Sequence, residues 1–122
     1  MKKKMIAVMA IVCALICAAA ACTPKEEDIV QKFGERDYAC KQLTSEEAQA
    51  YFAEEGAHVS EIKTAYLAAK GDDALVIALF ESSGAAKEAF GALGGDENAA
   101  LKKKGECLIL ALGASTAGLE VL

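Results

Sequence analysis

The chain has 122 residues, enough for one domain but too few for a multidomain enzyme. It contains 13 Lys and Arg against 18 Asp and Glu, and the only charges in the first 21 residues are Lys2, Lys3 and Lys4. Residues 22–122 therefore have a net charge of −8, which excludes a nucleic-acid-binding protein that relies on a basic surface. The apolar content of 54% excludes a disordered chain.

Residues 1–21 have the pattern of a secretory signal peptide. The three lysines precede an unbroken apolar run of 17 residues, from Met5 to Ala21. This run is shorter than the roughly 20 residues that a membrane-spanning helix needs. Cys13 and Cys17 lie inside it and would be removed with it, so we count neither as a metal ligand or disulfide partner.

The run ends in Ala19-Ala20-Ala21-Cys22, and these small residues before a cysteine resemble the lipobox of bacterial lipoproteins. Ala19 stands where that family more often has Leu. The resemblance covers about the first 24 residues. It implies cleavage after Ala21, a diacylglyceryl group on the Cys22 sulfur and a further acyl chain such as palmitate on its amino group. An ordinary cleaved signal, which Ala19-x-Ala21 also fits, and an uncleaved anchor are the alternatives.

The lipoprotein pattern divides the chain into a signal peptide (1–21), a short tether (22–25) and one domain (26–122). It implies attachment to the cell membrane through lipid, on the extracytoplasmic side. Residues 23–25 span only about 10 Å when extended, so we expect the domain to lie close to the bilayer. The negative domain gains no attraction to an anionic leaflet, so the acyl chains must supply the attachment.

The first half of the domain predicts helix, strand and helix. Residues 26–34 begin with three acidic residues and place Ile29, Val30 and Phe33 on one face, which favours a short helix. Residues 37–43 alternate apolar and polar side chains, which is typical of a strand. Thr44 and Glu47 fit a capping box that opens a second helix as far as about residue 55.

The second half predicts a hairpin, a helix and a strand. Residues 61–69 and 74–80 are apolar runs joined by Lys70-Gly71-Asp72-Asp73, a turn-forming sequence. Ser82 or Ser83 caps a helix that runs to about residue 93. A last strand covers residues 107–112, with Lys104-Gly105 as a candidate turn before it, and residues 115–122 could form one short helix.

The resulting order, β-α-β-β-α-β after a leading helix, indicates an α+β fold of the ferredoxin-like type. It predicts a two-layer sandwich: an antiparallel sheet with two helices on one face, the other face being free. In this topology the first and last strands are neighbours. A two-layer α+β sandwich with another strand order is the alternative.

Two thiols remain once Cys22 is acylated. Cys40 and Cys107 lie on the first and last predicted strands, and an extracytoplasmic compartment permits oxidation, so they could form a disulfide. The alternative is that each is a small buried apolar side chain. The sequence has no C-x-x-C motif and therefore gives no support to a redox function.

Catalytic and metal-binding patterns are weak throughout the sequence. His58 is the sole histidine, which argues against zinc and leaves it a solvated loop residue. The segment 113–117 resembles a G-x-S-x-G elbow only faintly, because Ala117 replaces the second Gly and His58 precedes Ser115. Asp72-Asp73 and Asp96-Glu97 could form a weak Ca²⁺ patch, but EF-hand spacing is missing. We therefore predict no metal and no cofactor.

Lys102-Lys103-Lys104 is a basic run in an acidic domain, which predicts either a solvated hairpin tip or a contact with an anionic partner or lipid headgroup. We expect a non-enzymatic binding or assembly module of the cell envelope, which uses its free sheet face to meet another envelope protein or a second copy. The first alternative is a small-molecule-binding accessory protein with a pocket near Tyr38, Tyr66 and His58. The second is an enzyme that brings together some of His58, Ser115, Glu47 and Asp72.

Overall fold

The computed structural model describes residues 23–113 and 115–122, so the predicted signal peptide and Cys22 lie outside the described residues. No helix within the described residues is long and apolar enough to cross a membrane. The elements, in chain order, are α2 (Glu26–Glu35), β1 (Ala39–Leu43), α3 (Ser45–Glu54), β2 (Ile62–Lys70), β3 (Asp73–Phe80), α4 (Ser83–Ala92), η2 (Gly95–Glu97), β4 (Leu101–Lys104), β5 (Cys107–Ala111) and η3 (Ala117–Glu120).

The described fold is α+β, with a five-stranded antiparallel sheet in the order β1-β2-β3-β5-β4. β1 pairs with β2 in the register Cys40 to Ala68, and β3 pairs with β5 in the register Ile77 to Ile109. The prediction of a ferredoxin-like strand order is wrong, because the first strand does not lie beside the last. The sheet also contains β4, a short edge strand that pairs with β5 and that the sequence indicated only through its turn.

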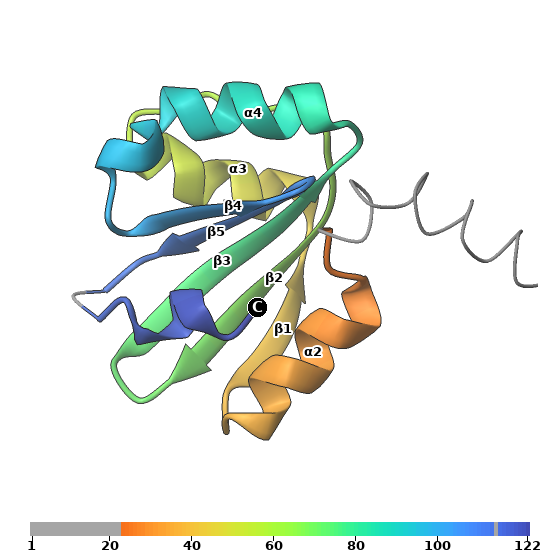
Figure 1. Cartoon of the computed structure of the whole chain (residues 1–122), viewed down its shortest axis with the longest axis vertical. Helices are drawn as coiled ribbons and strands as arrows, with labels where there is room; N and C mark the ends of the chain where they lie inside the picture. Colours follow the sequence, from red (N-terminus) through yellow and green to blue (C-terminus); the bar gives the residue numbers. More distant parts are fainter. Residues whose placement is uncertain (1–22, 114) are drawn as a thin grey trace, which may run out of the picture.

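Helices cover both faces of the sheet, so the prediction of two layers with one free face is wrong (Figure 1). On one face, α3 and α4 pack over the sheet and bury Phe52 and Ala86. On the other, α2 and the short η3 pack over it and bury Ile29, Phe33 and Leu119. The leading helix and the last residues thus form a third layer.

The central strands are buried on both faces. Along β3, Leu75, Ile77 and Leu79 belong to the core beneath α2, whereas Val76 and Phe80 belong to the core beneath α3 and α4. β5 divides its side chains between the two cores in the same way. A strand with helices on both sides has to be apolar at every position, which explains the continuous apolar runs.

The local predictions for the hairpin and the two capped helices are confirmed. β2 and β3 pair down to Lys70 and Asp73, and Gly71 in the turn has a φ of +59°. Thr44 and Glu47 form a capping box at α3, each bonding the other's backbone N–H. Ser82 caps α4 by accepting from the Ala85 N–H.

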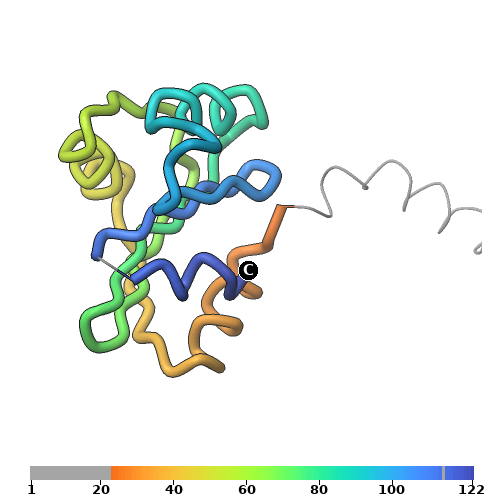
Figure 2. The backbone as a smooth tube through the Cα atoms, turned by 60° about the vertical axis from the view of Figure 1, so that its left-hand side comes forward, coloured from red at the N-terminus to blue at the C-terminus, as the bar shows by residue number. Residues whose placement is uncertain are grey.

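The start and the end of the described chain lie on the α2 side of the sheet (Figure 2). The C-terminal residue Leu122 is 8% exposed and shares a core with Ile29 and Phe33. Thr23, the first described residue, lies against the turn between β4 and β5. Both segments are therefore held by contacts with distant parts of the sequence.

Candidate functional site

Thr23 is held on the turn between β4 and β5. Its hydroxyl oxygen accepts a hydrogen bond of 2.9 Å from the backbone N–H of Glu106. Gly105, in the same turn, has a φ of +62°, and a Cβ there would lie 2.9 Å from the Thr23 nitrogen. Glycine is therefore favoured at position 105 both by its backbone conformation and by the close approach of Thr23.

The segment predicted as a tether is seated on the domain. Thr23 and Pro24 are half-buried, and Lys25 is the N-cap residue of α2. The Lys25 carbonyl oxygen accepts a 3.0 Å hydrogen bond from the Ile29 N–H, the first of the helix. No free spacer therefore lies between Thr23 and the domain.

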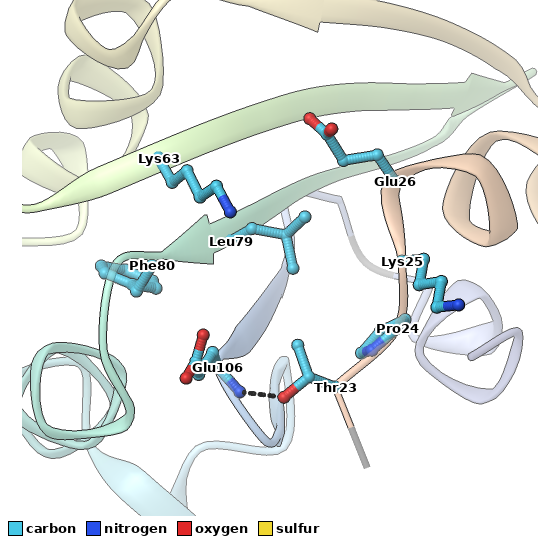
Figure 3. Close-up of a pocket in the computed structure, with 8 residues that line it drawn as sticks. All are labelled: Thr23, Pro24, Lys25, Glu26, Lys63, Leu79, Phe80 and Glu106. Atoms are coloured by element: carbon cyan, nitrogen blue, oxygen red, sulfur yellow. Dashed lines mark hydrogen bonds between the residues drawn. The ribbon is translucent and has the colours of Figure 1, made fainter. Parts of the chain in front are cut away.

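A pocket of about 250 Å³ lies beside this contact (Figure 3). The residues that line it are Thr23, Pro24, Lys25, Glu26, Lys63, Leu79, Phe80 and Glu106. Leu79 and Phe80 contribute apolar surface, and the amine of Lys63 points into the space (Figure 3). The pocket thus places a cation beside Thr23.

Lys63 owes its place in the pocket to a β-bulge. Ile62 pairs with Phe80 and Thr64 pairs with Leu79, so Lys63 is an extra residue in β2 with no partner on β3. Such a bulge bends the strand and redirects the side chain at the extra position. No sequence pattern indicates this arrangement, because a bulge depends on the register between two strands.

The basic run forms the short edge strand β4. Lys102 is not a solvated tip residue, since its Nζ donates hydrogen bonds to the carbonyl oxygens of Leu119 (2.9 Å) and Leu122 (3.2 Å). Lys103 and Lys104 are half-buried and precede the turn at Gly105. Of the three lysines, Lys104 is the one next to the turn on which Thr23 rests.

The two thiols lie far apart in the sheet. Cys40 is on β1 and Cys107 on β5, with β2 and β3 between them, and both are free. The expected disulfide rested on neighbouring first and last strands, and that premise is wrong. Burial raises the pKa of Cys107 to about 12 and also raises the pKa of Cys40. Neither group has the lowered pKa of a reactive thiolate.

The residues of the expected ligand pocket are not brought together. His58 precedes β2 and lines a pocket of about 140 Å³ with residues of α4. Tyr38 lies at the opposite end of β2, where its hydroxyl donates to Asp73 over 3.4 Å and Lys70 lies over its ring. Tyr66 bonds instead to Glu26, over 3.5 Å. Burial, followed by the neighbouring carboxylate, raises the pKa of both tyrosines.

The residues considered for catalysis are also separated. The Glu47 carboxylate is used in the capping box, and the Thr44 hydrogen bonds lower its pKa. Asp72 is in the β2–β3 turn, at the other end of β2 from His58. Ser115 bonds the backbone N–H of Ala117. Within the described residues no three His, Cys, Asp or Glu side chains are grouped to hold a metal ion.

Thr23 and Lys63 were the residues that the sequence alone did not single out as parts of a site. No local pattern in the sequence marks either of them. Only the folded structure brings residue 23 to residue 106.

No protein-family model, no curated protein and no solved structure matches this chain.

Proposed function

We propose that the chain is a bacterial lipoprotein, cleaved before Cys22, acylated there and held on the extracytoplasmic face of the cell membrane. The observation that carries this proposal is the junction at Cys22. The lipobox-like Ala19-Ala20-Ala21-Cys22 is followed at once by Thr23, which is hydrogen-bonded to the turn between β4 and β5. Cleavage before Cys22 would therefore leave every described element intact.

We further propose that the domain is a non-enzymatic binding or assembly module of the cell envelope. One observation supports this. Two of the four residues considered for catalysis are already engaged, because Glu47 accepts from the Thr44 N–H in the capping box and Ser115 accepts from the Ala117 N–H. The partner would be another envelope protein or a second copy. It would not meet a free sheet face, because α2 and η3 cover that face.

The test is the mass of the N-terminal peptide from protein purified out of the membrane fraction of a bacterial host. We expect a peptide that begins at Cys22 and carries a diacylglyceryl group and an added acyl chain. Cys22→Ser should abolish the modification and release the protein from membranes. Cys17→Ser, a change inside the removed segment, is the matched control and should leave both unchanged.

Recovery of the native protein from the cytosol with Met1 in place would overturn the proposal. A peptide that begins at Cys22 without lipid would support the ordinary signal instead. Cross-linking of the acylated protein in its own membranes, with identification of the linked peptides, distinguishes an envelope partner from a second copy. Cross-links that join two copies of this chain would indicate self-association.

A further inference from the structure

We propose that the end of the sheet formed by the β4–β5 turn, Thr23 and the Lys63 pocket is the surface that lies against the membrane. The proposal rests on the lipidation at Cys22 proposed above, and it adds an orientation. A flexible tether would let the domain turn freely over the bilayer. Here Thr23 is fixed to Glu106, so the anchor leaves the domain from one place.

The short span between the lipid and Thr23 leaves the domain little freedom to turn over the bilayer. One residue spans about 3.5 Å, and Cys22 alone stands between the lipid and Thr23. The headgroup layer of one leaflet is roughly 5–8 Å thick, as the difference between the whole bilayer and its hydrocarbon core. The pocket residues next to Thr23 are therefore placed at or in the headgroup layer whenever the Cys22 acyl chains are inserted.

The chemistry of this end suits a headgroup layer, which is polar and has phosphates at its surface. The Lys63 amine, which points into the pocket, and the Lys104 side chain beside Gly105 supply cations, while Leu79 and Phe80 line the pocket but are almost fully buried. Glu26 and Glu106 lie there too, together with Lys25, so the charges largely cancel and net charge does not drive the contact. The anchor supplies the affinity, and the fixed position of Thr23 determines which face meets the lipid.

The other end of the sheet carries a lysine with which the accessibility of Lys63 can be compared in the same molecule. Lys70 ends β2 at the β2–β3 turn, roughly 23 Å from Lys63 at about 3.3 Å per residue. Lys70 is exposed, as is Lys63. An orientation with the β4–β5 turn at the membrane would shield the amine of Lys63 and leave that of Lys70 in water.

The experiment is amine labelling of the full acylated chain in vesicles of phosphatidylethanolamine and phosphatidylglycerol, read residue by residue by mass spectrometry. The measured quantity is the labelling rate of Lys63 divided by that of Lys70 within the same molecules. The comparison is a variant with a flexible Gly-Ser segment inserted between Cys22 and Thr23. The insertion leaves the Thr23 contact and the fold intact but frees the domain from the surface.

We expect the ratio to be low in the natural chain and to rise in the insertion variant. Thr23→Ala, which removes the acceptor for the Glu106 N–H, should raise the ratio in part, whereas Thr23→Ser should leave it low. An equal ratio in the natural and inserted chains, with Cys22 shown to be acylated, would overturn the orientation alone. An unmodified Cys22 would overturn the lipoprotein proposal and the orientation with it.

Discussion

Gly118 lies directly on the side chain of Leu75. A Cβ at position 118 would stand 2.8 Å from Leu75 Cδ2 and 3.1 Å from its Cγ. Gly118 is in the buried part of η3, and Leu75 is 1% exposed in the centre of β3. The absence of a side chain at residue 118 therefore allows the last segment of the chain to close over the α2 face of the sheet.

Gly118→Ala should destabilise the protein. The added methyl group meets a fully buried leucine that cannot move without disturbing the core, so we expect a loss of about 1–3 kcal/mol in the free energy of unfolding. Urea unfolding followed by circular dichroism measures it. The control is Gly91→Ala in α4, where a Cβ would meet no atom within 4 Å. There alanine's helix propensity should stabilise the protein by about 0.5–1 kcal/mol. Equal effects at the two positions would contradict the packing at Gly118.

Thr44→Ala should weaken the start of α3 by about 1 kcal/mol, because it removes the acceptor for the Glu47 N–H. Thr44→Ser keeps the hydroxyl, and its stability should be close to that of the natural chain. Thermal unfolding of the three proteins gives the order of their stabilities. A Thr44→Ser variant as unstable as Thr44→Ala would show that the hydroxyl does not act as a cap.

The Glu47 carboxylate makes this cap depend on pH. Its pKa is lowered in the folded state by the hydrogen bond from the Thr44 N–H and by the bond to the Thr44 side chain. The stabilisation is therefore complete above the ordinary glutamate pKa of about 4.3 and is lost as the pH falls through the lower, folded value. Glu47→Gln should reduce stability at neutral pH, and the difference should shrink in acid. Glu46→Gln, in the same turn but outside the cap, should show a smaller dependence.

Features that depend on near neighbours in sequence could be predicted. The capping box at Thr44, the β2–β3 hairpin and the turn at Gly105 each involve residues within a few positions of one another. Their side chains and backbone preferences are sufficient to specify them. The lipobox-like pattern at Cys22 is also local, and it stays a prediction.

The strand order could not be predicted, because it depends on the path of the loop after α3. The sequence of the helix does not specify that path. Ten residues of α3 advance about 15 Å at 1.5 Å per residue. Residues 57–61 then run back, with Ala57 and Val59 buried, so β2 begins beside the end of β1 and pairs with it antiparallel. A strand-helix-strand pattern alone suggests a parallel pair across the sheet. The alternation of apolar and polar residues in Ala57-His58-Val59-Ser60 was the available sign.

The covering of the second face could have been inferred more fully. Residues 74–80 and 107–112 are apolar at every position, a pattern typical of strands buried on both sides. The prediction of a free face did not use that pattern. The site at Thr23 was out of reach, because residues 23 and 106 are joined only by the folded sheet.

Cys40 and Cys107 should differ sharply in their rate of alkylation by iodoacetamide, which reacts with the thiolate. In the folded protein we expect alkylation of the half-exposed Cys40 only. Cys107 is fully buried and burial raises its pKa to about 12, so it should react only after unfolding. Cys22→Ser protein is labelled without reductant, once folded and once in urea. Peptide mapping then measures the alkylation of Cys40 and Cys107 in each sample. Failure of both cysteines to react in urea would indicate a disulfide between them.

Lys102 should contribute more to stability than Lys103, its neighbour on β4. The Lys102 amine donates to the carbonyl oxygens of Leu119 and Leu122 and so ties the last segment to the sheet edge. Lys102→Met retains the apolar stem and removes the donors, and we expect a loss of about 1 kcal/mol in the free energy of unfolding, with faster hydrogen exchange in η3.

Lys103, whose side chain points to the opposite face of β4, serves as the control, since Lys103→Met removes the same charge without these bonds. Equal losses in the two variants would mean that the charge of β4, and not the bonds to Leu119 and Leu122, determines the effect. If the prediction holds, variants that probe the membrane-facing end should leave Lys102 in place, because a change there would disturb the fold as well as the surface.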